Sequence, residues 1–199
     1  MKKADLIRII TKCAKQYKEE LLDKSLFIIF DDNQGHTSAI EVCFSKRNFM
    51  HLTGVRTQMH PDQFFETCLN SRLKDTDVEV RKDGTTEQKL AVLPFLITKN
   101  LSAKMIGDYL PQGINLITEK MVGNVRGCLG FIPDKSTGRY VPNTILQDDV
   151  RKRVVNQQRI LAIYRKNYQD ERYEEIVYTA SGVTIESVLT ENIKDKISE

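Results

Sequence analysis

The sequence contains no run of about 18 apolar residues, the length that a membrane-spanning helix requires. Its amino terminus is basic, but Asp5, Arg8 and Lys12 interrupt the apolar core that a secretion signal would need. Cysteine is scarce and forms no CxxC pair; the four residues are Cys13, Cys43, Cys68 and Cys128. We therefore expect a cytoplasmic protein without a membrane partner, whose cysteines are reduced and buried in the core.

Several catalytic motifs are also missing. The sequence has no GxxxxGKS/T loop, no GxGxxG after a strand and no HExxH. Its three histidines are scattered, and no group of carboxylates suggests two-metal cleavage of a phosphodiester. These absences argue against P-loop nucleotide hydrolysis and zinc catalysis, so we expect neither a cofactor nor a metal.

The composition is that of an ordinary globular protein. The 199 residues are 40% hydrophobic and 29% charged, without a low-complexity tract, so the chain can bury a core as one domain. The formal net charge of +3 permits a nucleic-acid partner without identifying one.

The first half of the chain has the pattern of helices and one hairpin. Apolar residues recur at helical spacing from Ala4 to Leu22, and residues 25–44 have the pattern of a β-hairpin. Pro61 stands at the first position of a second helix. A third helix opens at Thr85, whose spacing to Gln88 is that of a capping box.

Beyond Ala103, short apolar segments with strand spacing follow one another. They lie at residues 104–109, 114–120, 122–132, 139–141, 159–166 and 176–180, before a last short helix near residues 185–193. N-terminal helices and a hairpin followed by an antiparallel β-meander make an α+β fold. We expect a single domain, 1–199, with an N-terminal helix at 1–24, a core at 25–180 and a C-terminal helix or tail at 181–199.

His51 is the first candidate for chemistry. Residues 48–55 have the pattern of a strand end, with Met50 and Leu52 on one face and His51 and Thr53 on the other. A histidine can both accept and donate a proton near neutral pH, which RNA transesterification requires at the 2′ and 5′ oxygens. Without further context, a surface or hydrogen-bonded structural histidine is the better interpretation.

Two cations fall on the apolar faces of predicted helices. On a helical wheel, Lys89 falls among the apolar residues from Leu90 to Leu96, and Arg72 falls among those from Phe65 to Leu69. Such a cation either meets an anion, for example a phosphate, or extends its charged group to water. Lys89 fits both interpretations, whereas extension to water is the simpler one for Arg72.

Further polar residues are candidates for substrate contacts, each with a structural alternative. The glycines of residues 122–131 indicate bulges or a close approach to the backbone. Thr144 has capping-box spacing to Gln147, and Tyr164 could stack on a base or pack in the core. The substrate-binding candidates are Thr53, Lys120, Asn124, Asn143, Thr144, Tyr164 and Lys166.

Five segments together resemble a known family. They are residues 49–55, Gly84-Thr85-Thr86 with Lys89-Leu90, residues 103–109, Gly123-Asn124 with Gly130-Phe131, and residues 141–144. The set is similar to the phage-associated branch of the barnase, EndoU, colicin and RelE-like (BECR) nucleases. The resemblance covers residues 25–180.

The resemblance implies a helical N-terminal part followed by a four-stranded antiparallel meander whose face holds the active site. It also implies metal-independent RNA cleavage that leaves a cyclic phosphate, in toxins or in conflict between phages and bacteria. The superfamily varies its catalytic residues, so the resemblance assigns no roles. His51 and Lys89 lie within matching segments.

We therefore expect a metal-independent endoribonuclease that acts on RNA, tRNA being one candidate, and that has a neutralising protein partner. In this hypothesis His51 is the general base or acid, and Lys89 and Arg72 stabilise the phosphorane. Phosphate oxygens are oriented by Thr53, Asn124, Asn143 or Thr144. One alternative is a non-catalytic inhibitor of the same fold that binds RNA or a host protein; another is a small transferase acting on a nucleotide or protein.

Overall fold

The structure is a computed structural model that describes residues 2–111 and 116–198. The helices are α1 (Lys3–Glu20), α2 (Lys46–Thr53), α3 (Pro61–Leu69), α4 (Thr85–Leu96), α5 (Ile185–Val188) and α6 (Glu191–Lys194), with a 3-10 turn η1 (Val150–Lys152). The strands are β1 (Lys24–Asp31), β2 (Thr37–Cys43), β3 (Met105–Tyr109), β4 (Lys120–Gly123), β5 (Cys128–Pro133), β6 (Tyr140–Leu146), β7 (Val154–Asn167) and β8 (Glu175–Thr179).

The strands form one sheet that closes on itself. Its order is β1-β2-β6-β5-β4-β3-β7, β7 pairs back to β1, and β8 joins the other side of β7. The first part of β7 pairs with β3 and its second part with β1 and β8, so one long strand completes a seven-stranded barrel. Successive strands from β3 to β6 are antiparallel, whereas β2 and β6 are parallel.

The α+β class is therefore confirmed, but the antiparallel meander is not, because the sheet is mixed and closed. The pairing of Val42 with Tyr140 joins the N-terminal hairpin to the later strands in parallel. These two residues are 98 positions apart in the sequence, and the local residue pattern of neither strand indicates that they pair.

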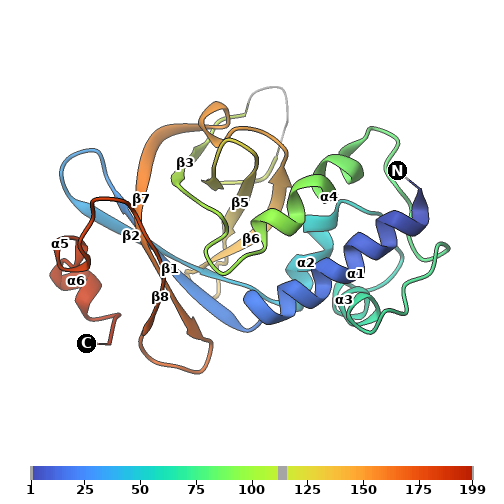
Figure 1. The fold of residues 1–199 in the computed structure, drawn as a ribbon, viewed down its shortest axis with the longest axis horizontal. Coiled ribbons are helices and arrows are strands. Elements are labelled where there is room, and N and C mark those ends of the chain that lie inside the picture. The colour runs from blue at the N-terminus through green and yellow to red at the C-terminus, as the bar shows by residue number, and fades with distance from the viewer. Residues whose placement is uncertain (1, 112–115, 199) are drawn as a thin grey trace.

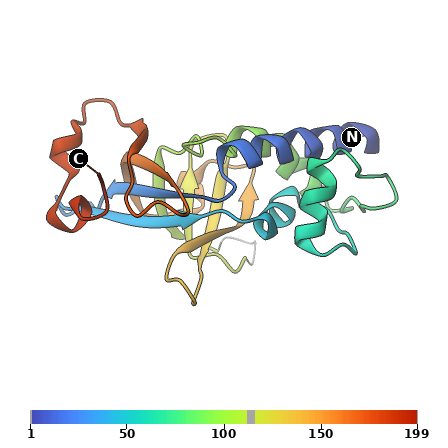
Figure 2. The same ribbon diagram turned by 90° about the horizontal axis from the view of Figure 1, so that it is seen from below.

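Helices α1 to α4 gather on one side of the closed sheet, and α5 and α6 lie on the other side (Figures 1 and 2). The main hydrophobic cluster joins these four helices to the sheet. Its aromatic part is centred on Tyr17, whose ring contacts Phe44, Phe49 and Phe65. The buried hydroxyl of Tyr17 donates a hydrogen bond to the Ser45 carbonyl at 2.9 Å, which fixes the start of α2.

The C-terminal segment packs against a second hydrophobic cluster on β1 and β7. Phe27 stacks on Tyr173 at 5.2 Å between ring centroids, and Val188, Ile193 and Ile197 cover them. The expected last helix is thus two short helices.

The expectation of a strand at residues 48–55 is wrong, because these residues form most of α2. Phe49, Leu52 and Thr53 are buried at helical spacing. Asn48 accepts a hydrogen bond from the Ser45 backbone N–H at 2.8 Å, which caps the helix start. Gly54 ends the helix in the left-handed conformation, with φ of 72°.

Other local expectations also need correction. Residues 122–132 are a hairpin of β4 and β5, and Thr144 lies inside β6, so it caps no helix. Gly84, not Thr85, caps α4. The segment expected at 114–120 lies partly outside the described residues, and β4 begins at its last residue.

The four cysteines are buried and free, as expected. Across residues 2–111 and 116–198, none of the helices has the length and apolar character needed to span a membrane.

Candidate active site

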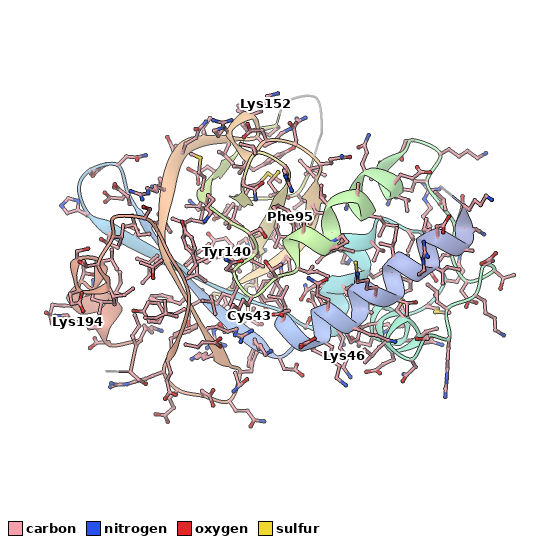
Figure 3. All side chains as sticks on the ribbon, viewed as in Figure 1. Cys43, Lys46, Phe95, Tyr140, Lys152 and Lys194 are labelled. Atoms are coloured by element: carbon pink, nitrogen blue, oxygen red, sulfur yellow. The ribbon has the colours of Figure 1, made fainter. Side chains whose placement is uncertain are left out.

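A pocket of about 760 Å³ opens where α2, the first turns of α4 and β6 meet. Helix α2 is held there from two sides. Lys46, labelled in Figure 3, pairs with Glu66 of α3 at 2.5 Å, and the Asn48 side-chain amide donates to the Pro142 carbonyl of β6 at 3.2 Å. The start of α2 therefore has a fixed position beside β6, and His51 follows in the last turn of the same helix.

Lys89 connects the three elements that form the pocket. Its Nζ donates to the His51 carbonyl of α2 at 2.9 Å and to the Thr144 Oγ1 of β6 at 3.2 Å. A β-carbon at Gly54 would lie 2.8 Å from the Lys89 Cδ, so glycine is needed for this side chain to pass. Neither partner of the ammonium group is an anion, although a phosphate oxygen would be a stronger acceptor.

Burial and the neighbouring charge of Arg81 lower the pKa of Lys89 from its usual 10.5 to about 8. The amine is still mostly protonated at neutral pH. It nevertheless releases its proton more readily than an exposed lysine, which suits a group that stabilises charge and donates a proton.

His51 lies on the last turn of α2 and lines the pocket, partly open to solvent and partly covered by its neighbours. Partial burial, together with the charge of Lys89, lowers the pKa of His51 below its usual 6.5. At neutral pH the imidazole is therefore uncharged and able to accept a proton.

Two arginines that the sequence analysis did not single out, Arg56 and Arg81, also line the pocket. The Arg81 backbone N–H donates to the Thr86 Oγ1 at 3.1 Å, and that hydroxyl donates to the Gly54 carbonyl at 2.9 Å. Arg56 is held by a backbone bridge to Glu79. Both residues lie outside the helices, where no periodic pattern could have identified them.

The pocket lining is cationic. It includes Arg56, Arg81 and Lys89, and no carboxylate occurs among the lining residues that the structure describes. The start of α4 adds the polar side chains of Thr85 and Gln88. Because the chain as a whole is nearly balanced in charge, this local excess of cations favours an anionic ligand.

Two of the predicted residues on β6, Asn143 and Thr144, reach the pocket. Thr144 accepts the hydrogen bond from Lys89. Asn143 donates to the Ile117 carbonyl and accepts from the Thr118 Oγ1 at 3.2 Å, so it holds the segment before β4. The structure thus brings His51, Lys89, Asn143 and Thr144 together.

Thr53 and Arg72 lie outside the pocket. Thr53 is fully buried, and its hydroxyl donates to the Met50 carbonyl at 2.8 Å. Arg72 is exposed and follows the end of α3 at Leu69, so its place on a helical wheel has no structural meaning.

The other four predicted contacts are also elsewhere. Lys120 pairs with Asp108 at 2.5 Å, and Asn124 ties its turn to the Ser102 carbonyl at 2.6 Å. Tyr164 is 2% exposed and belongs to the cluster under the C-terminal helices. Lys166 lies over the Tyr173 ring and donates to the Glu171 carbonyl at 2.9 Å.

In residues 2–111 and 116–198, no group of three or more His, Cys, Asp and Glu side chains is arranged to hold a metal ion. A family model described as phage-Barnase-EndoU-ColicinE5/D-RelE like nuclease4 matches residues 9–182. Comparison with curated proteins and with solved structures gave no match.

Proposed function

Because the chain belongs to the family of phage-Barnase-EndoU-ColicinE5/D-RelE like nucleases, we propose that it is an endoribonuclease that cleaves RNA without a metal ion. The observation that carries this proposal is the hydrogen bonding of Lys89, which places a cation against α2 and β6 in a pocket that favours anions. A scissile phosphate would replace these neutral acceptors with an anionic one.

The proposed reaction is a transesterification. The neutral imidazole of His51 takes the proton of a ribose 2′-hydroxyl, and the 2′ oxygen attacks the adjacent phosphorus. The bond from phosphorus to the 5′ oxygen breaks, so the products are a 2′,3′-cyclic phosphate and a 5′-hydroxyl. The nucleophile is part of the substrate, and the two proton transfers need only His51 and Lys89.

Lys89 supplies the charge and the second proton. Its ammonium group stabilises the extra negative charge of the phosphorane, and its lowered pKa allows it to protonate the leaving 5′ oxygen. Thr144 holds the amine in place from β6. The cationic lining supports a mechanism in which protein cations, and not metal-bound carboxylates, neutralise the phosphate.

Cleavage is tested with purified protein, total tRNA and ribosomal RNA in excess chelator. We expect discrete fragments with wild-type protein and a rate lower by a factor of about 100 or more with His51→Ala, because the base is lost. Lys152→Ala removes an exposed cation of η1 outside the pocket and serves as the matched control. Intact RNA that remains bound would instead indicate a non-catalytic RNA-binding protein.

The lowered pKa values of His51 and Lys89 also predict a bell-shaped dependence of kcat/KM on pH. Below the lowered pKa of His51 the base is protonated, so kcat/KM falls on the acid side, at a lower pH than the usual histidine pKa of 6.5 would give. Above about pH 8 Lys89 loses its proton, so kcat/KM falls again. The check is kcat/KM across the range of about pH 5 to 10, with Lys89→Arg expected to move the alkaline limb upward. An alkaline limb that does not move would remove Lys89 from the proton transfer.

A further inference from the structure

The guanidinium of Arg81 is a charged group of the pocket that the mechanism above does not use. Its Nε is buried and has no hydrogen-bond partner among the residues that the structure describes. A buried donor of a charged group is costly when it lacks an acceptor. The backbone of Arg81 is nevertheless held in place by Thr86, which is itself bonded to the Gly54 carbonyl.

Arg81 lies within electrostatic reach of Lys89 and of Asp83. Burial and, after it, the charge of Arg81 lower the pKa of Lys89. Hydrogen bonds to Thr85 and, after them, the charges of Arg81 and Arg56 lower the pKa of Asp83. Asp83 is exposed and accepts the Thr85 N–H at 3.0 Å. Within the described part of the chain, neither the Arg81 nor the Arg56 side chain forms an ion pair with the Asp83 carboxylate. An anion from outside the protein would therefore complete the surroundings of these cations.

One phosphodiester does not account for this arrangement. Each phosphodiester carries a single negative charge, whereas the pocket presents Lys89, Arg81 and Arg56. Its volume of about 760 Å³ lies in the range of sites that enclose a whole organic ligand. Both the positive charge and the volume of the pocket fit a nucleic-acid strand with more than one phosphate.

We propose that Arg81, together with the exposed Arg56 of the same pocket lining, binds a phosphate that flanks the phosphate under attack at Lys89. This inference rests on the proposed ribonuclease function. It defines the substrate of the protein as an RNA strand with at least two consecutive phosphates. Arg81 is a binding residue for the flanking phosphate, and Lys89 acts on the scissile one. The guanidinium presents several donors in one plane, which matches two oxygens of a phosphate.

The test compares three dinucleotide substrates. One has the scissile phosphate alone, the second has an added 5′-terminal phosphate, and the third has an added 3′-terminal phosphate. We expect wild-type kcat/KM to be about tenfold or more higher for one of the phosphorylated substrates than for the plain dinucleotide. Arg81→Gln should lower kcat/KM more on that phosphorylated substrate than on the plain dinucleotide, so that the preference is lost, and Arg81→Lys should restore part of the preference.

The Lys89→Met variant is the control, because it should reduce the rate on all three substrates. Equal loss by Arg81→Gln on all three would overturn the inference and place Arg81 at the scissile phosphate. An unchanged preference would also overturn it. The variant should fold normally, since it removes a buried donor that has no partner in the described residues, and thermal unfolding checks this.

A binding measurement separates this inference from the proposed reaction. A 2′-O-methyl oligonucleotide cannot be cleaved by transesterification, so its affinity reports contacts alone. Arg81→Gln should lower the slope of log affinity against log salt by about 0.7, the value for one phosphate contact on a single strand. A lower salt slope in Arg81→Gln, without cleavage of RNA by the wild-type protein, would support the phosphate site and refute the nuclease function. Cleavage without that result would refute the phosphate site alone.

Discussion

Replacing Lys89 by methionine is expected to reduce RNA cleavage by a factor of about 100 to 1,000 and, at the same time, to stabilise the protein. Cleavage falls because the pocket loses the cation that meets the phosphorane. Stability rises because methionine fills the space of the lysine stem without placing a charge in a half-buried position beside Arg81. The half-buried side chain is partly screened by solvent, so we expect a gain of about 1 kcal/mol, or about 3 °C in Tm.

The pH dependence of this gain has a defined sign. In the folded protein the pKa of Lys89 is about 8, below its usual 10.5, so the unfolded chain binds the proton more tightly. The cost to the wild-type protein is fully present below about pH 8 and disappears as pH rises toward 10.5. The difference in free energy of unfolding between Lys89→Met and wild type should shrink over that interval.

Denaturant unfolding at several pH values, together with the cleavage assay, provides the measurement. Lys152→Met is the matched control, because it removes an exposed lysine of η1 and should change neither property much. A Lys89→Met variant that is less stable than wild type would show that the ammonium group mainly holds α2 to β6. A variant that still cleaves RNA at the wild-type rate would exclude Lys89 from the reaction.

Replacing Gly54 by alanine is expected to lower kcat by about 10- to 100-fold while the fold remains intact. The new β-carbon would lie 2.8 Å from the Lys89 Cδ, so the flexible lysine must move away. A displacement of about 1 Å at a reacting group can cost two orders of magnitude in rate. The positive φ of 72° adds a loss of about 1 kcal/mol in stability.

Gly138→Ala is the control for backbone strain. Gly138 has a similar φ of 69°, but an added β-carbon there would meet nothing within 4 Å. Both variants should therefore lose similar stability in thermal unfolding, whereas only Gly54→Ala should lose activity. Equal activity in the two variants would mean that the position of the Lys89 stem does not limit the reaction.

The sequence predicted those elements whose residues carry a strong local pattern. Helix α1 has a regular apolar stripe and was expected near its observed bounds, and α3 begins at Pro61 as expected. The end of α3 was not predicted, because the helix stops at Leu69, before Arg72. Helix α2 was missed because residues 50–53, within Lys46–Thr53, alternate in polarity, and strand spacing and helix spacing cannot be separated over so short a segment.

Closure of the sheet could not be predicted either, because the strand that closes it has a clear pattern over only part of its length. The first residues of β7, which pair with β3, are mostly exposed and polar, so only the second half of this strand has a recognisable pattern. The site was predicted in part. Lys89 stood out as a cation on an apolar helix face, whereas Arg56 and Arg81 lie in irregular segments that only the packing of α2 against α4 brings to the pocket.

The chemistry of the product ends tests the central claim most directly. A defined RNA oligonucleotide is incubated with wild-type protein in excess chelator, and the masses of the fragments are determined. The account predicts a 2′,3′-cyclic phosphate on one fragment and a 5′-hydroxyl on the other, and neither in the Lys89→Met variant. Intact RNA, or fragments with 5′-phosphate and 3′-hydroxyl ends, would contradict it.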